Sequence, residues 1–98
     1  MPGAEGGALE AVVSRVEELI NRRKWLRQQL AELEHRYGIK THEFMASWSS
    51  GKLPEPEDPD LLSDFLRWEA LASELEKVEE ELRRMLVIAP GAKGEGRG

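Results

Sequence analysis

The sequence predicts an all-α protein, an antiparallel hairpin of two long helices with a short helix between them. Two stripes of mostly apolar side chains support this prediction, one from Leu9 to Tyr37 and one from Leu61 to Met85. In both stripes the spacings alternate between three and four residues, which keeps the side chains on one narrow face of a helix. The stripes are similar in length, and the connector between them contains helix-breaking residues. We therefore expect the two helices to fold back on each other.

The first helix is predicted over residues 8–36. No Gly or Pro interrupts this segment, and Leu, Glu, Arg and Gln, which favour helices, are frequent in it. Gly38 follows directly after the stripe and suits the left-handed conformation that ends a helix. Four charged side chains are spaced for ion pairs one turn apart: Glu18 with Arg22, and Glu32 with Arg36.

A short helix is predicted over residues 42–49, with Thr41 as its N-cap. Phe44, Met45 and Trp48 would form its apolar face, and Gly51 would end it. Three Pro follow within residues 54–59 and favour an extended path. Leu53 is the apolar side chain that we expect to anchor this stretch.

The last helix is predicted over residues 59–87. Asp58 is a suitable N-cap, and Pro59 suits the first helical position because that position needs no backbone N–H donor. This helix has eight acidic and four basic side chains from Asp60 to Arg84, whereas the first long helix is near balance. That asymmetry can orient the two helices against each other or orient a partner.

We expect one helical domain over residues 8–88, with disordered Gly-rich tails at 1–7 and 89–98. About 80 folded residues form a marginal core, and the chain has no Cys for a disulfide. Val13 and Ile20 widen the apolar face of the first helix beyond one seam. We therefore expect the hairpin to dimerise into a four-helix bundle, with a domain-swapped arrangement as the alternative.

Charge and composition argue against several classes of function. The net charge of −5 disfavours nucleic-acid binding by the chain on its own. No apolar run is long enough to cross a membrane and no secretory signal is visible, so we expect a cytoplasmic protein. His35 and His42 match no standard metal spacing. We find no phosphate-binding loop, catalytic triad or Cys nucleophile, and expect neither a cofactor nor enzymatic activity.

Three side chains depart from the stripes. Arg23 and Asp64 occupy core-type positions, at different heights of the hairpin. Arg23 either packs its stem while its charge reaches water, or acts as a polar register device or a reserved charge for a ligand. Trp25 lies outside the stripe within the basic segment 22–27, which is either a solvated helix face or a nucleic-acid contact. Exposed aromatic side chains often anchor protein interfaces.

The connector has a distinctive pattern: Tyr37-Gly38-Ile39-Lys40-Thr41, Glu43-Phe44, Trp48, Gly51-Lys52-Leu53, an acidic turn, then Phe65, Trp68 and Ala70-Leu71. Over roughly residues 30–80 this pattern resembles a family of small prokaryotic antitoxin-like helical proteins, although the acidic turn here carries three Pro. The resemblance implies that the protein neutralises a partner toxin by binding it. We take as candidate partner-binding residues Trp25 and the apolar side chains of the connector and its flanks: Trp25, Tyr37, Phe44, Trp48, Leu53, Phe65 and Trp68.

Residues 18–26 are also similar to the first helix of helical chorismate mutases, which form dimers. That resemblance implies an enzyme in which Arg23 and Lys40 would grip a dicarboxylate substrate. The chain departs from that family because its short helix lacks the Arg-Glu pair and its last helix lacks the expected Gln. A third possibility is a purely structural coiled-coil subunit.

Overall fold

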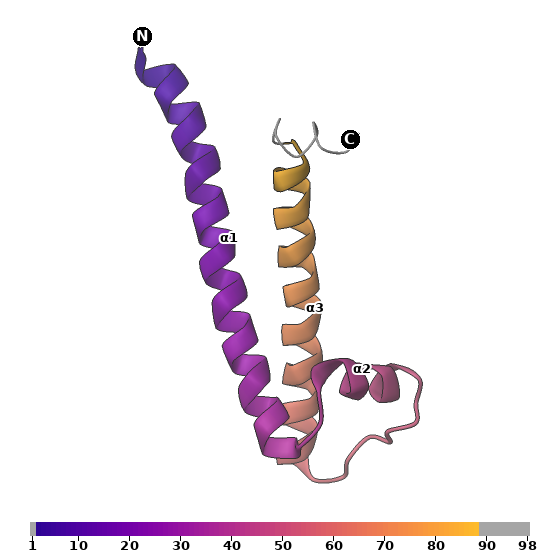
Figure 1. The fold of residues 1–98 in the computed structure, drawn as a ribbon. Helices are drawn as coiled ribbons and strands as arrows, with labels where there is room; N and C mark the ends of the chain where they lie inside the picture. The colour runs from indigo at the N-terminus through magenta and orange to yellow at the C-terminus, as the bar shows by residue number, and fades with distance from the viewer. Residues whose placement is uncertain (1, 89–98) are drawn as a thin grey trace.

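The computed structural model describes the backbone of residues 2–88 and the side chains of residues 7–86. Three helices make up this part of the chain: α1 (Pro2–Tyr37), α2 (Thr41–Ser49) and α3 (Pro59–Ile88), with no strand among the described residues. Figure 1 shows α1 and α3 as long helices running in opposite directions, with α2 beside the end at which they are joined. The predicted all-α hairpin with a short intervening helix is therefore confirmed. Dimerisation stays a prediction.

Contacts between α1 and α3 follow one constant antiparallel register. Three successive polar pairs lie along one flank of the seam: Arg15 with Glu81, Arg22 with Glu74, and Gln29 with Arg67. Each step of seven residues forward on α1 matches a step of seven back on α3. This is the repeat of an antiparallel coiled coil, and it follows from the three-and-four spacing of the stripes. Within the single chain the two helices thus pair as a hairpin, and the domain-swapped alternative stays a prediction.

The start of α1 corrects the sequence-based boundary. The helix begins at Pro2, so residues 2–7, which were predicted to belong to a disordered tail, are helical. Pro2 suits a first helical position because its missing N–H is not needed there, and Ala4 and Ala8 are the strongest helix formers in this stretch. The predicted tail at 89–98 lies outside the described residues. At its other end α1 stops as predicted, because Gly38 adopts φ +70° and donates its N–H to the Glu34 carbonyl at 2.8 Å.

The start of α2 also differs from the prediction. Thr41 is the first helical residue and Lys40 is the N-cap. The backbone N–H of Lys40 donates to the Glu43 carboxylate at 3.3 Å, while the Thr41 hydroxyl accepts a hydrogen bond from Trp68 Nε1 at 3.0 Å. Thr41 is therefore engaged in joining α2 to α3, which a local capping rule does not anticipate. Gly51, at φ +80°, follows the helix as predicted.

The start of α3 is confirmed. The Asp58 carboxylate accepts a hydrogen bond from the Asp60 N–H at 3.1 Å, and the Asp58 carbonyl accepts one from the Leu62 N–H at 2.9 Å. These two bonds are those of an N-cap residue that precedes Pro at the first helical position.

Most of the core lies along the seam and under α2. Its buried side chains come from all three helices: Leu19, Leu26, Leu30, Leu33, Phe44, Phe65, Trp68, Leu71, Val78 and Leu82. At the joined end, rings from the three helices form what we call the aromatic cluster: Tyr37, Phe44, Trp48, Phe65 and Trp68. Phe44 stacks on Trp68 with ring centroids 4.1 Å apart and on Trp48 at 5.9 Å. The distinctive connector pattern therefore builds a core.

Ion pairs tie α1 to α3. Arg27 pairs with Glu79 at 2.6 Å on the flank opposite Arg22 and Glu74. The pairs expected one turn apart within α1 are not formed, because Arg22 and Arg36 bind carboxylates of α3 instead. Arg22 gains a bidentate partner across the seam in Glu74, whereas Arg36 makes one contact, from Nη1 to Asp64. The excess acid on α3 thus orients the two helices, as the charge asymmetry suggested.

Candidate interaction surface

Trp25 is the large aromatic side chain that α1 presents to solvent. It lies outside the seam, and 41% of its surface is exposed, as predicted. The Arg22 guanidinium lies over its ring, 4.6 Å from the ring centroid. Arg22 is one turn earlier on the same helix, so the helix itself brings the cation onto the ring.

Arg22 is in turn held by α3. Its Nε and Nη2 donate to the two Glu74 carboxylate oxygens at 2.6 and 2.9 Å, which is a bidentate arrangement. Hydrogen bonding from Arg22 lowers the pKa of Glu74, so this carboxyl stays charged in the fold. A guanidinium fixed on one edge and stacked on a ring restricts the motion of both side chains. The structure therefore holds Trp25 in a defined orientation at the surface.

A shallow hollow of about 530 Å³ adjoins this ring, between α1 and α3. Its floor includes the apolar side chains Leu19 and Val78, and its walls carry both charges, from Arg15, Lys77 and Glu81. Arg15 and Glu81 are already paired at 3.0 Å. We call Trp25, Arg22 and this hollow the Trp25 surface. Sequence reasoning identified Trp25 but missed Arg22 and Glu74, although the i,i+3 spacing of Arg22 and Trp25 was a visible signal for the stacking.

The other candidate partner-binding residues lie together, away from the Trp25 surface. Phe44, Phe65 and Trp68 are buried in the aromatic cluster, where they hold the three helices together. Tyr37, Trp48 and Leu53 are half-buried and pack against the same core. The structure thus groups six of the candidates at the joined end of the hairpin. Of these six, Tyr37, Trp48 and Leu53 are partly exposed to solvent.

Asp64 has a specific structural role at this end. Its carboxylate accepts hydrogen bonds from the Tyr37 hydroxyl and, at 2.8 Å, from Arg36 Nη1. The hydroxyl bond from Tyr37 and the Arg36 charge hold the pKa of Asp64 below its ordinary value, although partial burial opposes this shift. The polar break in the second stripe is therefore a tie between the last turn of α1 and the first turns of α3.

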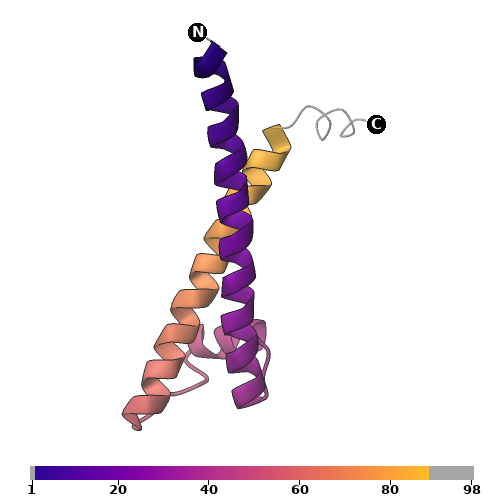
Figure 2. The same cartoon turned by 90° about the vertical axis from the view of Figure 1, so that its left-hand side faces the viewer.

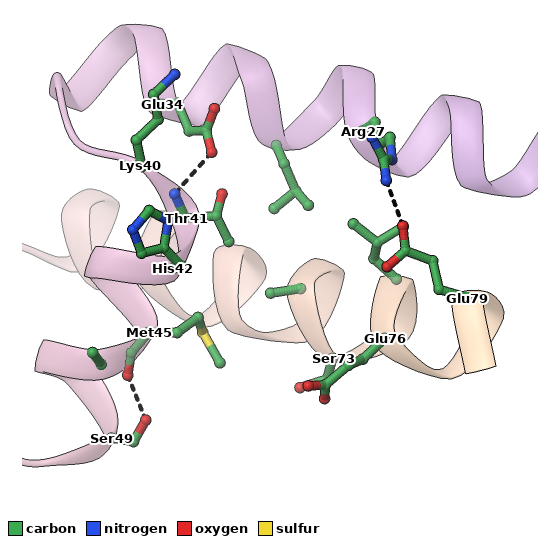
Figure 3. A pocket seen from close by; sticks show the side chains of 14 residues that line it. Arg27, Glu34, Lys40, Thr41, His42, Met45, Ser49, Ser73, Glu76 and Glu79 are labelled. Atoms are coloured by element: carbon green, nitrogen blue, oxygen red, sulfur yellow. Dashed lines mark hydrogen bonds and ion pairs between the residues drawn. The ribbon is translucent and has the colours of Figure 1, made fainter.

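A larger groove, of about 740 Å³, lies between the three helices (Figure 3). Arg27 pairs with Glu79 across one end, and the Thr41 N–H donates to the Glu34 carboxylate at 2.8 Å at the other. Partial burial raises the pKa of Glu34, but the hydrogen bonds from Thr41 outweigh it and hold the pKa low. These polar groups satisfy one another, so we assign them to the fold.

Residues that the sequence suggested for other chemistry do not converge. Lys40 lines the groove, but Arg23, its counterpart in the chorismate-mutase-like hypothesis, does not. Arg23 is half-buried, and within residues 7–86 no carboxylate forms an ion pair with it. No group of three or more potential metal ligands gathers among the described residues. Within the same part of the chain, no helix has both the length and the apolar character to span a bilayer.

Comparison with known proteins adds a family. No curated protein and no solved structure matches the chain at a significant level. A family model described as the uncharacterized protein MJ0235 family matches residues 10–88, which include α2, the described part of α3 and α1 from Glu10 onward. The match covers the seam, the connector and the Trp25 surface together. The chain belongs to the uncharacterized protein MJ0235 family.

Proposed function

We propose that this protein acts by binding another protein and has no catalytic role. Its function would be the antitoxin-like one that the connector pattern suggests, in which the chain neutralises a small toxin by covering part of its surface. The proposed place of action is the cytoplasm. The chain would contact this partner directly and would not bind nucleic acid on its own, in keeping with its net charge of −5.

The observation that carries this proposal is the fixed orientation of Trp25. Trp and Arg are the side chains most enriched among residues that dominate protein–protein affinity. A side chain that is already ordered loses less entropy on binding than a mobile one. Here the Glu74 carboxylate fixes Arg22, and Arg22 stacks on the exposed ring. The Trp25 surface is thus suited to insert an aromatic ring into a pocket of a partner.

The hollow beside the ring supports the same conclusion. It offers an apolar floor of Leu19 and Val78 beside paired charges, and a protein interface similarly combines an apolar centre with a polar rim. Because Glu74 and Val78 belong to α3 and Trp25 to α1, the surface exists only when the hairpin has its observed register. In this proposal the aromatic cluster contributes indirectly, by fixing that register at the joined end.

Co-expression with the product of the adjacent gene tests the proposal. We expect the two proteins to co-purify as a complex of defined stoichiometry, with the activity of the partner suppressed. Trp25→Ala should weaken the complex by about thirtyfold or more, the usual effect of removing a dominant interface aromatic. Leu66→Ala is the matched control, because Leu66 is a large apolar side chain, 50% exposed on α3, outside the Trp25 surface.

Two outcomes would contradict the proposal. The first is a neighbouring gene product that is not a small toxin-like protein, together with a failure to co-purify. The second is a complex that Trp25→Ala leaves as tight as the wild type, with the circular dichroism of the variant unchanged. The second outcome would leave the partner in place but remove the Trp25 surface from the interface.

A further inference from the structure

The N-terminal half of α1 carries a second apolar stripe that does not pack on α3. Leu9, Val13, Val16 and Ile20 follow one another at spacings of four, three and four residues, so they share one helix face. Val16 also packs against the core between the helices, and Leu9 is also the first residue of the stripe predicted for the seam. Leu9 is 67% exposed, and Val13 and Ile20 are exposed as well.

This stripe lies at the open end of the hairpin. Figures 1 and 2 both show α1 continuing past the described end of α3, while α2 lies at the opposite end. The neighbouring apolar side chains at this end, Val12 on α1 and Leu86 on α3, are 52% and 60% exposed. A region with this much exposed apolar surface is typical of an interface.

We infer that a second copy of this chain covers the stripe, with the α1 helices of the two copies packed antiparallel about a two-fold axis. The argument for this occupant is the self-complementary spacing of the stripe. It is independent of the proposed function, which uses the Trp25 surface.

The spacing of the stripe fits its own reverse. In an antiparallel pair, Leu9 of one copy lies opposite Ile20 of the other, and Val13 lies opposite Val16. The two-fold axis repeats both pairs, so all four apolar positions find apolar partners. This register is set by the same three-and-four spacing that aligns α1 with α3.

Sedimentation equilibrium of the purified full chain tests the dimer and its register. We expect a reversible dimer. Val13→Asp together with Ile20→Asp should weaken it by about a hundredfold or more, because the two-fold axis places four charges in the apolar interface. Trp25→Ala should leave the dimer unchanged, which separates this test from that of the partner complex.

Cross-linking checks the position of the axis without relying on affinity. The chain has no Cys, so a single introduced thiol reports one position. Glu17→Cys should be joined into covalent dimers by a short bis-maleimide. Gln28→Cys is the control, because Gln28 is also exposed on α1 but would lie roughly 30–40 Å from its symmetry mate in this register.

The inference is overturned if the chain sediments as a monomer at every concentration. It is also overturned if Gln28→Cys cross-links as readily as Glu17→Cys. A dimer that survives Val13→Asp with Ile20→Asp would contradict it as well. Both positions are exposed, so this variant keeps the hairpin, which circular dichroism verifies.

Discussion

The two ends of this hairpin are built in opposite ways. At the joined end, rings from three helices stack on one another, Trp68 is fully buried, and Asp64 and Thr41 tie the helices together. Toward the open end Leu19 and Leu82 keep the seam buried, but other apolar side chains of α1 and Leu86 of α3 are exposed, and Arg15 pairs with Glu81 on the flank. The same heptad spacing runs through both ends. What distinguishes them is α2, which covers only the joined end.

This difference separates a part that maintains the fold from a part that is available for contact. Stacked, buried rings contribute several kcal/mol each, whereas exposed ion pairs contribute about 1 kcal/mol or less. Substitutions in the aromatic cluster should therefore cost more stability than substitutions of the exposed ion pairs.

Trp68→Ala removes the centre of the joined end. Trp68 is fully buried, stacks on Phe44 and donates to Thr41, so we expect a loss of about 3–5 kcal/mol in the free energy of unfolding. Urea unfolding followed by circular dichroism measures it. Leu66→Ala, two residues earlier and half exposed, should change the same quantity by about 0.5 kcal/mol or less. Equal effects of the two substitutions would mean that the cluster is not the core.

Gly38→Ala strains the turn from which α2 departs. Gly38 has φ +70°, a conformation that an L-residue adopts at a cost of about 1–2 kcal/mol. The added methyl group meets no atom within 4 Å, so backbone strain alone is tested. Thermal unfolding should show a lower midpoint for the variant. A midpoint equal to that of the wild type would show that the turn does not require the left-handed conformation.

Tyr37→Phe tests the tie to Asp64 and its dependence on pH. The hydroxyl of Tyr37 is the main cause of the lowered pKa of Asp64. A carboxyl whose pKa is lower in the folded than in the unfolded state stabilises the fold above its unfolded pKa and loses that contribution as the pH falls. We expect the wild type to lose stability between about pH 5 and pH 3, and the variant to show a shallower loss, with stability about 1 kcal/mol lower at neutral pH. If the stabilities of the wild type and the variant change with pH in parallel, the Tyr37–Asp64 hydrogen bond does not contribute to the pH dependence.

Gly7→Ala acts at the open end and, unlike the preceding substitutions, should raise the stability of the protein. Gly7 lies within α1, and a methyl group there meets no atom within 4 Å. Replacing a helical Gly by Ala should stabilise the helix by about 0.4–1 kcal/mol. Mean residue ellipticity and the unfolding midpoint should both rise slightly. A decrease in either would argue that residues 2–7 are not helical in solution, as the first boundary prediction had it.

Much of the hairpin could be predicted because its signals are local. Asp58 before Pro59 marks the start of α3, and Gly38 marks the end of α1, since each acts through its own backbone. The alternating apolar spacing likewise predicts both long helices. The start of α1 at Pro2 was missed, because Gly-rich composition is weak evidence against helix when the flanking residues favour it.

The parts that could not be predicted depend on residues far apart in the sequence. Arg22 has a suitable carboxylate at Glu18 on its own helix, yet it binds Glu74, and only the antiparallel register decides between them. Thr41 fits the local pattern of an N-cap, but its hydroxyl accepts a hydrogen bond from Trp68, which is distant in the sequence. The connector aromatics resemble exposed contact residues in sequence, but the return of α3 buries Phe44, Phe65 and Trp68. The exposure of Trp25 was predicted correctly because α3 approaches a different face of α1.

Amide hydrogen exchange at two protein concentrations tests the contrast between the ends most directly. We predict that amides of residues 30–37 and 64–71 exchange slowly at both concentrations, because the joined end is complete within one chain. Amides of residues 9–20 should exchange faster in the dilute sample and become protected in the concentrated one, as a second α1 covers them. Protection of residues 9–20 that is as strong as that of the joined end and independent of concentration would contradict the account.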